Sequence, residues 1–160
     1  NWNEIPLSKE MNAEWVEIDF VKTAFLNEPH WSGDTHGFCL NIGNPHIIYF
    51  VSDCSKINIK ELGPKIENYK IFPERVNVTF ASVSADRKNI KVSVWERGAG
   101  QTKACGTAAC ATAKAALCQG LANVNSNVHF KDGSLQIDCA TDNIFMTGPV
   151  SEIKKINVDI

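Results

Sequence analysis

The 160-residue sequence has little net charge and no long apolar run, and each shortage excludes a class of protein. Its 16 Lys and Arg against 18 Asp and Glu leave a net charge of -2, so it lacks the basic surface that nucleic acids and anionic membranes attract. Its apolar stretches, such as 47–51, are far too short to span a bilayer, and no charged start followed by an apolar segment marks a signal peptide. These properties predict a soluble, globular, single-domain protein with a small-molecule partner and no nucleic-acid or membrane partner.

Closely spaced cysteines are also lacking, because none of the six stands in a CxxC pair. The four histidines do not lie at metal-ligand spacing from the cysteines, so no metal site is expected. An even number of cysteines allows a disulfide framework, but the irregular spacing favours reduced thiols and a cytoplasmic protein. Two of the thiols, Cys110 and Cys118, fall within an expected helix and are predicted to be buried there.

Short β-rich segments, separated by Gly, Pro, Asn and Asp, dominate the sequence. Strands are predicted at 17–21, 37–42, 46–51, 76–83, 89–96, 128–130, 135–139 and 144–147. A short helix is predicted at 59–69, and Gly63-Pro64 is expected to bend or restart it, because proline suits a first helical turn better than an interior.

The long helix candidate at 107–119 has an unusual composition. Between Thr107 and Leu117 its only charge is Lys114, and Gly120 follows as a C-terminal cap. A helix that is apolar and small-sided nearly all round is normally buried. The sequence therefore predicts an α+β fold in which an antiparallel or mixed sheet wraps around a central helix. The alternative is an alanine-rich helix lying on one sheet.

A thiol stands where this helix is expected to begin, in the segment Cys105-Gly106-Thr107. The first N–H groups of a helix have no internal partner and carry the positive end of the helix dipole, so this corner favours anions. One such anion is the Cys105 thiolate, whose pKa the helix start would lower; another is a substrate carboxylate held by the N–H groups of Gly106 and Thr107. The alternative is an inert buried cysteine at a tight turn.

Four further polar residues stand at strand ends, where binding sites are often built. Arg97 can hold a carboxylate with two hydrogen bonds, and Glu96 can accept from an ammonium group. Asn44 and Asn77 lie at two other turn-to-strand junctions. Each feature also has a plain structural interpretation, since Glu96-Arg97 suits a solvated pair and each asparagine suits a turn.

Four stretches together resemble the C-terminal half of diaminopimelate epimerases. They are GNPH at 43–46, FPERVN at 72–77, WERGAGQTKACGTAACA at 95–111 and MTGP at 146–149. The resemblance implies that residues 1–160 are the C-terminal domain of a two-domain protein with its active site in the cleft between the domains. It also implies that the N-terminal domain, which carries a second cysteine in a Met-Cys-Gly-Asn context, is absent here. None of the five other cysteines of this chain has that context.

The implied activity is the cofactor-independent inversion of one α-carbon, which interconverts LL- and meso-diaminopimelate. By the same resemblance, Cys105 is one of two catalytic cysteines, and the Gly106 and Thr107 N–H groups hold the reacting carboxylate. The resemblance also assigns roles to residues around them: Asn44, Asn77 and Arg97 bind the distal end of the substrate, Glu96 lies near its ammonium, and His46 and Glu96 tune the cysteines.

Two other interpretations stay open at this point. A related racemase or isomerase of the same fold would share the scaffold, and a noncatalytic homologue would bind an amino acid without reacting with it. The sequence also leaves a homodimer open.

Overall fold

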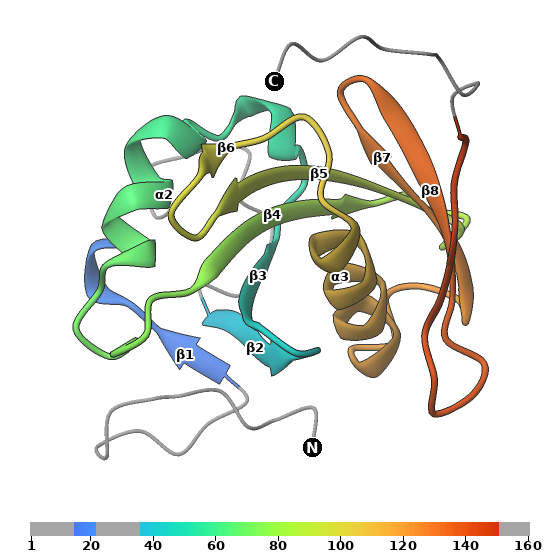
Figure 1. Cartoon of the computed structure of the whole chain (residues 1–160), viewed down its shortest axis with the longest axis horizontal. Helices are drawn as coiled ribbons and strands as arrows, with labels where there is room; N and C mark the ends of the chain where they lie inside the picture. Colours follow the sequence, from blue (N-terminus) through green and yellow to red (C-terminus); the bar gives the residue numbers. More distant parts are fainter. Residues whose placement is uncertain (1–14, 22–35, 151–160) are drawn as a thin grey trace, which may run out of the picture.

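The computed structural model describes residues 15–21 and 36–150, which form one mixed sheet and two main helices (Figure 1). The strands are β1 (Trp15–Glu17), β2 (His36–Asn41), β3 (Pro45–Phe50), β4 (Asn77–Val83), β5 (Asn89–Glu96), β6 (Gly100–Gln101), β7 (Asn125–Phe130), β8 (Gly133–Asp138) and β9 (Phe145–Thr147). The helices are η1 (Cys54–Lys56), α2 (Ile59–Glu67) and α3 (Gly106–Cys118). No helix in the described ranges is long and apolar enough to cross a membrane.

The sheet has the order β1-β2-β3-β4-β5-β7-β8-β9, with β6 paired to the end of β5. The pairs β3–β4 and β5–β7 are parallel, and the other pairs are antiparallel. Each parallel pair needs a crossover connection. The first crossover contains η1 and α2, and the second contains β6 and α3.

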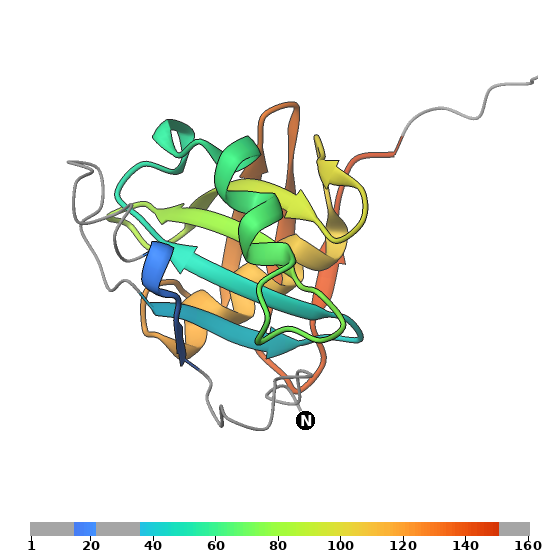
Figure 2. The ribbon, with the colours of Figure 1, turned by 90° about the vertical axis from the view of Figure 1, so that its left-hand side faces the viewer.

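The two helices cover opposite faces of the central strands (Figure 2). The α2 face has a core of large aliphatic and aromatic side chains, among them Tyr49 and Phe80, whose rings stack with centroids 5.3 Å apart. The other core lies around α3 and contains its alanines. α3 contacts β2, β3, β4, β5, β7, β8 and β9, so strands from both ends of the sheet reach it. The predicted central helix in an α+β sheet is thereby confirmed.

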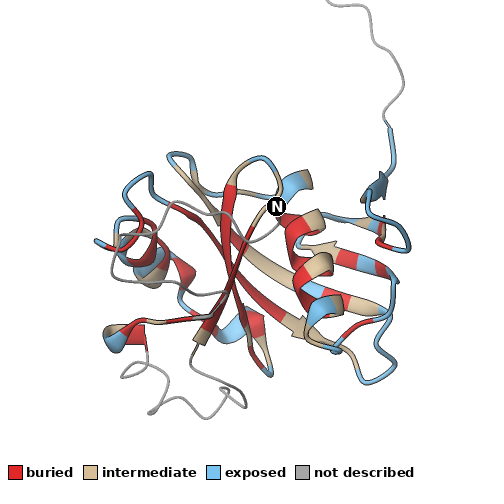
Figure 3. Cartoon of the chain, turned by 90° about the horizontal axis from the view of Figure 1, so that it is seen from below, coloured by how far each residue is buried: buried red, intermediate tan, exposed pale blue. Residues whose placement is uncertain are grey.

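Small side chains explain why α3 lies so deep in the fold (Figure 3). A helix lined by alanine lets strands approach its backbone, which larger side chains would prevent. Its buried residues are Ala108, Ala109, Ala111, Thr112, Ala113, Ala115 and Ala116. The helix ends as predicted at Gly120, which has a φ of 66°, and the N–H groups of Gly120 and Leu121 donate to the carbonyls of Leu117 and Ala116. These two bonds form a Schellman cap.

Most predicted strands and both helices are present within a few residues of their expected bounds, but some details were wrong. The strand expected at 17–21 is β1 at Trp15–Glu17, followed by helical residues at 19–21. There Ile18 and Val21 are both buried, three residues apart, and the Val21 N–H donates to the Ile18 carbonyl. That spacing suits one helical turn better than a strand. The short β6 and η1 were not predicted.

α2 runs without a break through Gly63-Pro64, so of the bend or restart expected there, the restart does not occur. Pro64 lies inside the helix and removes one hydrogen bond, whose acceptor would have been the carbonyl of Lys60. Lys60 is exposed, so water can reach its carbonyl. Gly63 packs against the Trp95 indole so closely that a Cβ atom would lie 2.5 Å from the ring. This contact holds the helix against the sheet.

Candidate functional site

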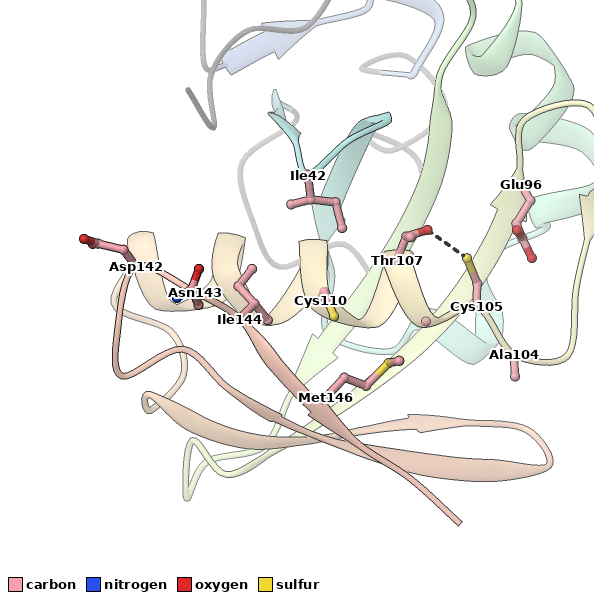
Figure 4. Close-up of a pocket in the computed structure, with 11 residues that line it drawn as sticks. Ile42, Glu96, Ala104, Cys105, Thr107, Cys110, Asp142, Asn143, Ile144 and Met146 are labelled. Atoms are coloured by element: carbon pink, nitrogen blue, oxygen red, sulfur yellow. Dashed lines mark hydrogen bonds between the residues drawn. The ribbon is translucent and has the colours of Figure 1, made fainter. Parts of the chain in front are cut away.

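The predicted thiol lies at the start of α3, on the wall of an open pocket of about 770 Å³ (Figure 4). Cys105 is the N-cap residue of the helix, and its residue surface is 8% exposed. The pocket is lined by residues from β5, the start of α3, and the segments before β3 and around β9: Ile42, Glu96, Ala104, Cys105, Gly106, Thr107, Cys110, Asp142, Asn143, Ile144 and Met146. Four of the predicted site residues, Glu96, Cys105, Gly106 and Thr107, are therefore brought together.

The Cys105 sulfur has a polar neighbour on each side (Figure 4). Its Sγ atom lies 3.4 Å from the Thr107 hydroxyl oxygen, and the Glu96 carboxylate faces it from the end of β5. Burial raises the pKa of the Cys105 thiol most strongly. The Thr107 hydroxyl and the Ala108 N–H lower this pKa, and the negative charge of Glu96 raises it.

Two expectations from the sequence about the cysteines were wrong. The pKa of Cys105 is raised, because burial and Glu96 outweigh the donors at the helix start. The other correction concerns the helix cysteines: Cys118 is exposed and Cys110 is half-buried. All six cysteines are free thiols.

Because its pKa is raised, Cys105 is protonated at neutral pH, and Cys110 is a second thiol on the same pocket wall.

A chain of hydrogen bonds leads from the buried core to the sulfur. The His46 ring is fully buried, and its Nε2 lies 2.9 Å from the amide oxygen of Asn44, which can only accept. The Asn44 amide nitrogen donates to the Thr107 hydroxyl at 3.5 Å, and that hydroxyl contacts Cys105. Thus Asn44 contacts the first turn of α3 and His46 holds Asn44, although neither residue lines the pocket.

His46 is neutral in the folded protein. Burial, followed by the charge of Arg97, lowers its pKa from the ordinary 6.5 to about 4. As the pH falls below 6.5 the unfolded chain takes up a proton at this ring, and the folded protein does so only near pH 4. We therefore expect the free energy of unfolding to fall by about 3 kcal/mol between pH 7 and pH 4 from this group alone.

Urea unfolding of wild type and His46→Gln across this range measures that contribution. Glutamine keeps an N–H donor for Asn44 and cannot titrate, so the variant should show a flatter pH dependence. His129→Gln removes another strand histidine, one that contacts Asn89, and serves as the matched control. An unchanged slope in His46→Gln would show that the acid sensitivity has another source.

Asn77 and Arg97 do not line the pocket. Asn77 is buried, and both ends of its amide are occupied: the nitrogen donates to the Pro45 carbonyl, and the oxygen accepts from the backbone N–H of Arg97, each at 2.9 Å. The Arg97 guanidinium donates to the Glu74 carbonyl at 2.9 Å. Asn77, at the start of β4, thus links β3 to the residue after β5, and Arg97 links the end of β5 to the segment before β4.

Several lining residues were missed from the sequence. Met146 belongs to one of the stretches quoted above, and its sulfur would lie 3.1 Å from a Cβ atom on Gly106. This close approach explains why the helix begins with glycine. Asp142 and Asn143 stand in a loop whose composition indicates only a turn, and Ile144, expected as the first residue of a strand, directly precedes β9. Among the described residues, no group of three or more His, Cys, Asp or Glu side chains is placed to hold a metal ion.

Comparisons with known proteins show what this chain is similar to. The family model described as diaminopimelate epimerase matches residues 38–153. A diaminopimelate epimerase of Pelagibacter ubique is 49% identical over 100% of this chain and 56% of its own length. One of Bacteroides thetaiotaomicron is 46% identical over 71% of this chain and 43% of its own length, so the chain spans about half the length of these relatives.

Among solved structures, a phenazine biosynthesis protein of the PhzF family from Bacillus anthracis aligns with 22% identity and a TM-score of 0.44. The alignment covers 71% of this chain and 32% of that protein.

Proposed function

Because the chain belongs to the diaminopimelate epimerase family, we propose that it forms one domain of an enzyme that interconverts LL- and meso-diaminopimelate. The observation that supports this most directly is Cys105, a thiol at a helix start inside a pocket shared with Glu96. The second domain of the proposed enzyme carries the other catalytic cysteine and closes the open side of this pocket. The aligned regions cover 56% and 43% of the lengths of these two relatives, which is consistent with a second domain in each.

The proposed chemistry is a proton exchange between two opposed thiols. A thiolate on one face of the substrate removes the α-proton, and a thiol on the other face donates its own proton to the resulting carbanion, which inverts the centre. The first thiolate becomes a thiol, and the second thiol becomes a thiolate. The raised pKa of Cys105 supports the donor role for it in the resting protein. In the reverse direction Cys105 is the base.

The start of α3 stabilises the charge that develops during this exchange. The N–H groups of Gly106 and Thr107 have no acceptor within the helix and lie on the pocket wall beside Cys105. Donors fixed near the reacting carboxylate stabilise negative charge as the α-proton leaves. Met146 packs against Gly106, and we propose that it helps to keep water from this corner.

Glu96 has two roles in the proposal. Its carboxylate faces Cys105, where its charge raises the thiol pKa, and it can accept from the substrate ammonium. Arg97, Asn44 and Asn77 are assigned to the distal end of the substrate. The Asn77 amide nitrogen carries a second N–H besides the one on the Pro45 carbonyl, and the Arg97 guanidinium carries further N–H groups besides the one on the Glu74 carbonyl, so neither has to give up its present bond to donate to the substrate. His46 tunes the thiols through Asn44 and Thr107.

The proposed mechanism uses no cofactor, because proton removal and return need only the two thiols and the donors around them. A cytoplasmic location and a homodimer belong to the same proposal.

The test is an assay of the two-domain protein with LL-diaminopimelate in deuterated water. We expect the meso isomer to appear and deuterium to enter at the α-carbon, since the donor thiol exchanges its proton with solvent. Titration calorimetry in parallel measures binding. Binding without inversion or deuterium incorporation would contradict the proposed enzyme and identify an amino-acid-binding homologue.

A further inference from the structure

A buried carboxylate on α2 lies next to the site without belonging to it. Glu67 is the last residue of α2, and its side chain is 6% exposed. Burying a carboxylate is costly unless hydrogen bonds replace its water. Glu67 has three such bonds: from the Trp95 indole N–H to Oε2 at 2.7 Å, from the Gly98 backbone N–H to Oε1 at 2.8 Å, and from Arg75 Nη1 to Oε1 at 3.1 Å.

Two of these donors stand on either side of the Glu96-Arg97 pair. Trp95 precedes the pair on β5, and Gly98 follows it in the turn to β6. Gly98 has a φ of 79°, a conformation that suits glycine. One carboxylate therefore holds both ends of a four-residue segment, of which Glu96 faces the Cys105 thiol.

The same segment is also held by Asn77. The Arg97 N–H donates to the Asn77 side chain, while the next N–H along the chain, that of Gly98, donates to Glu67. The turn also has a bond of its own, from the Ala99 N–H to the Glu96 carbonyl at 3.1 Å, and the β5–β6 pairing joins Glu96 to Gly100. Buried side chains from α2 and β4 thus define the path of this turn.

We propose that Glu67 is a positioning residue of the site. Through Trp95 and Gly98, Glu67 sets the position of the Glu96 carboxylate relative to Cys105. It also sets the direction in which the Arg97 side chain extends from the turn. It does not touch the pocket, so its effect is exerted through those two neighbours. The hydrogen bonds of Glu67 alone support its role in holding the turn, whereas its effect on catalysis rests on the proposed function.

Glu67→Gln in the two-domain protein tests this. Glutamine keeps the size of the side chain but replaces one acceptor oxygen with an NH₂ donor, which then faces the N–H of Trp95 or Gly98. We expect the amide of Gly98 or the indole of Trp95 to exchange with deuterium at least about tenfold faster, as the loss of a bond to a charged group implies. We also expect kcat/KM to fall by about tenfold or more, with a rise in KM as Arg97 loses its direction.

Ile66→Val is the matched control, because Ile66 is the adjacent, fully buried residue of the same helix and does not bond to the turn. It should leave the exchange of Gly98 and Trp95 and the value of KM near wild type. An equal loss of kcat/KM in Ile66→Val would reduce Glu67 to a packing role. Unchanged exchange at both groups in Glu67→Gln would overturn the proposal outright.

The exchange measurement needs no turnover, so it separates this proposal from the proposed function. If wild type does not invert diaminopimelate, the proposed function fails, and the exchange rates still decide whether Glu67 holds the turn. If Glu67→Gln does not fold, Trp95→Phe removes one of the three donors and is judged by faster exchange at Gly98 and by the same rise in KM. Wild-type values for both would contradict the proposal.

Discussion

Replacing Cys105 with serine in the two-domain protein is expected to lower epimerisation by roughly 100- to 10,000-fold in both directions, the range of a lost general acid or base. A serine hydroxyl is a far weaker acid than a thiol, so it neither donates its proton readily nor forms the base. Each direction of the reaction uses Cys105 once, as donor or as base. Rates measured from LL- and from meso-diaminopimelate should therefore fall together.

Binding should survive this substitution. The proposed contacts to the substrate come from the start of α3, Glu96 and Arg97, none of which requires the sulfur. Cys110→Ser is the matched control, because Cys110 lines the same pocket from the next part of α3 and has no assigned role. Arg97→Ala should show the reverse pattern, with weaker binding. Near-normal turnover in Cys105→Ser, or a loss of binding equal to that in Arg97→Ala, would remove Cys105 from the mechanism.

The 160-residue chain without the other domain is expected to show no inversion of diaminopimelate. It supplies one thiol of the proposed pair, and its pocket is open to water on the side that the second domain would cover. Without an opposed thiol, a proton removed by Cys105 returns to the same face. Resolving the stereoisomers after incubation with LL-diaminopimelate measures this directly.

A control for contaminating activity is the same chain with Cys105→Ala. Turnover well above buffer that disappears in this variant would show that the chain is sufficient, so that a thiol from another copy or from elsewhere in the chain acts as the second base.

The sequence predicted the scaffold better than the contacts within it. Turn residues at the strand ends and the apolar composition of 107–119 identify most of the strands and the central helix, because these signals are local. β1 was misplaced because Ile18 and Val21 are β-branched residues that favour strands, although their three-residue spacing suits a helical turn. β6 was missed because it has only two residues. It pairs with the end of β5 across a turn that Glu67 holds.

The site shows the same limit. The thiol and the helix start are readable in Cys105-Gly106-Thr107, but its pKa depends on burial and on Glu96, which approaches from another strand. Asn77 and Arg97 reach each other across twenty residues of sequence, and the Asn77 amide is used within the fold. Glu67 has no sequence signal, since a glutamate at the end of a short helix is usually solvated.

The crossover from β5 to β7 has a consequence for how such a protein can change during evolution. Since β5 and β7 are parallel, the helix between them must start beside the end of β5, so Glu96 and the first turn of α3 are adjacent by topology. The core depends on the alanine face of the helix, whereas the reactive groups lie at the end of β5 and at the start of the helix. Substitutions at 96–107 can therefore alter the chemistry of this corner while the packing around Ala111 and Ala115 is inherited unchanged.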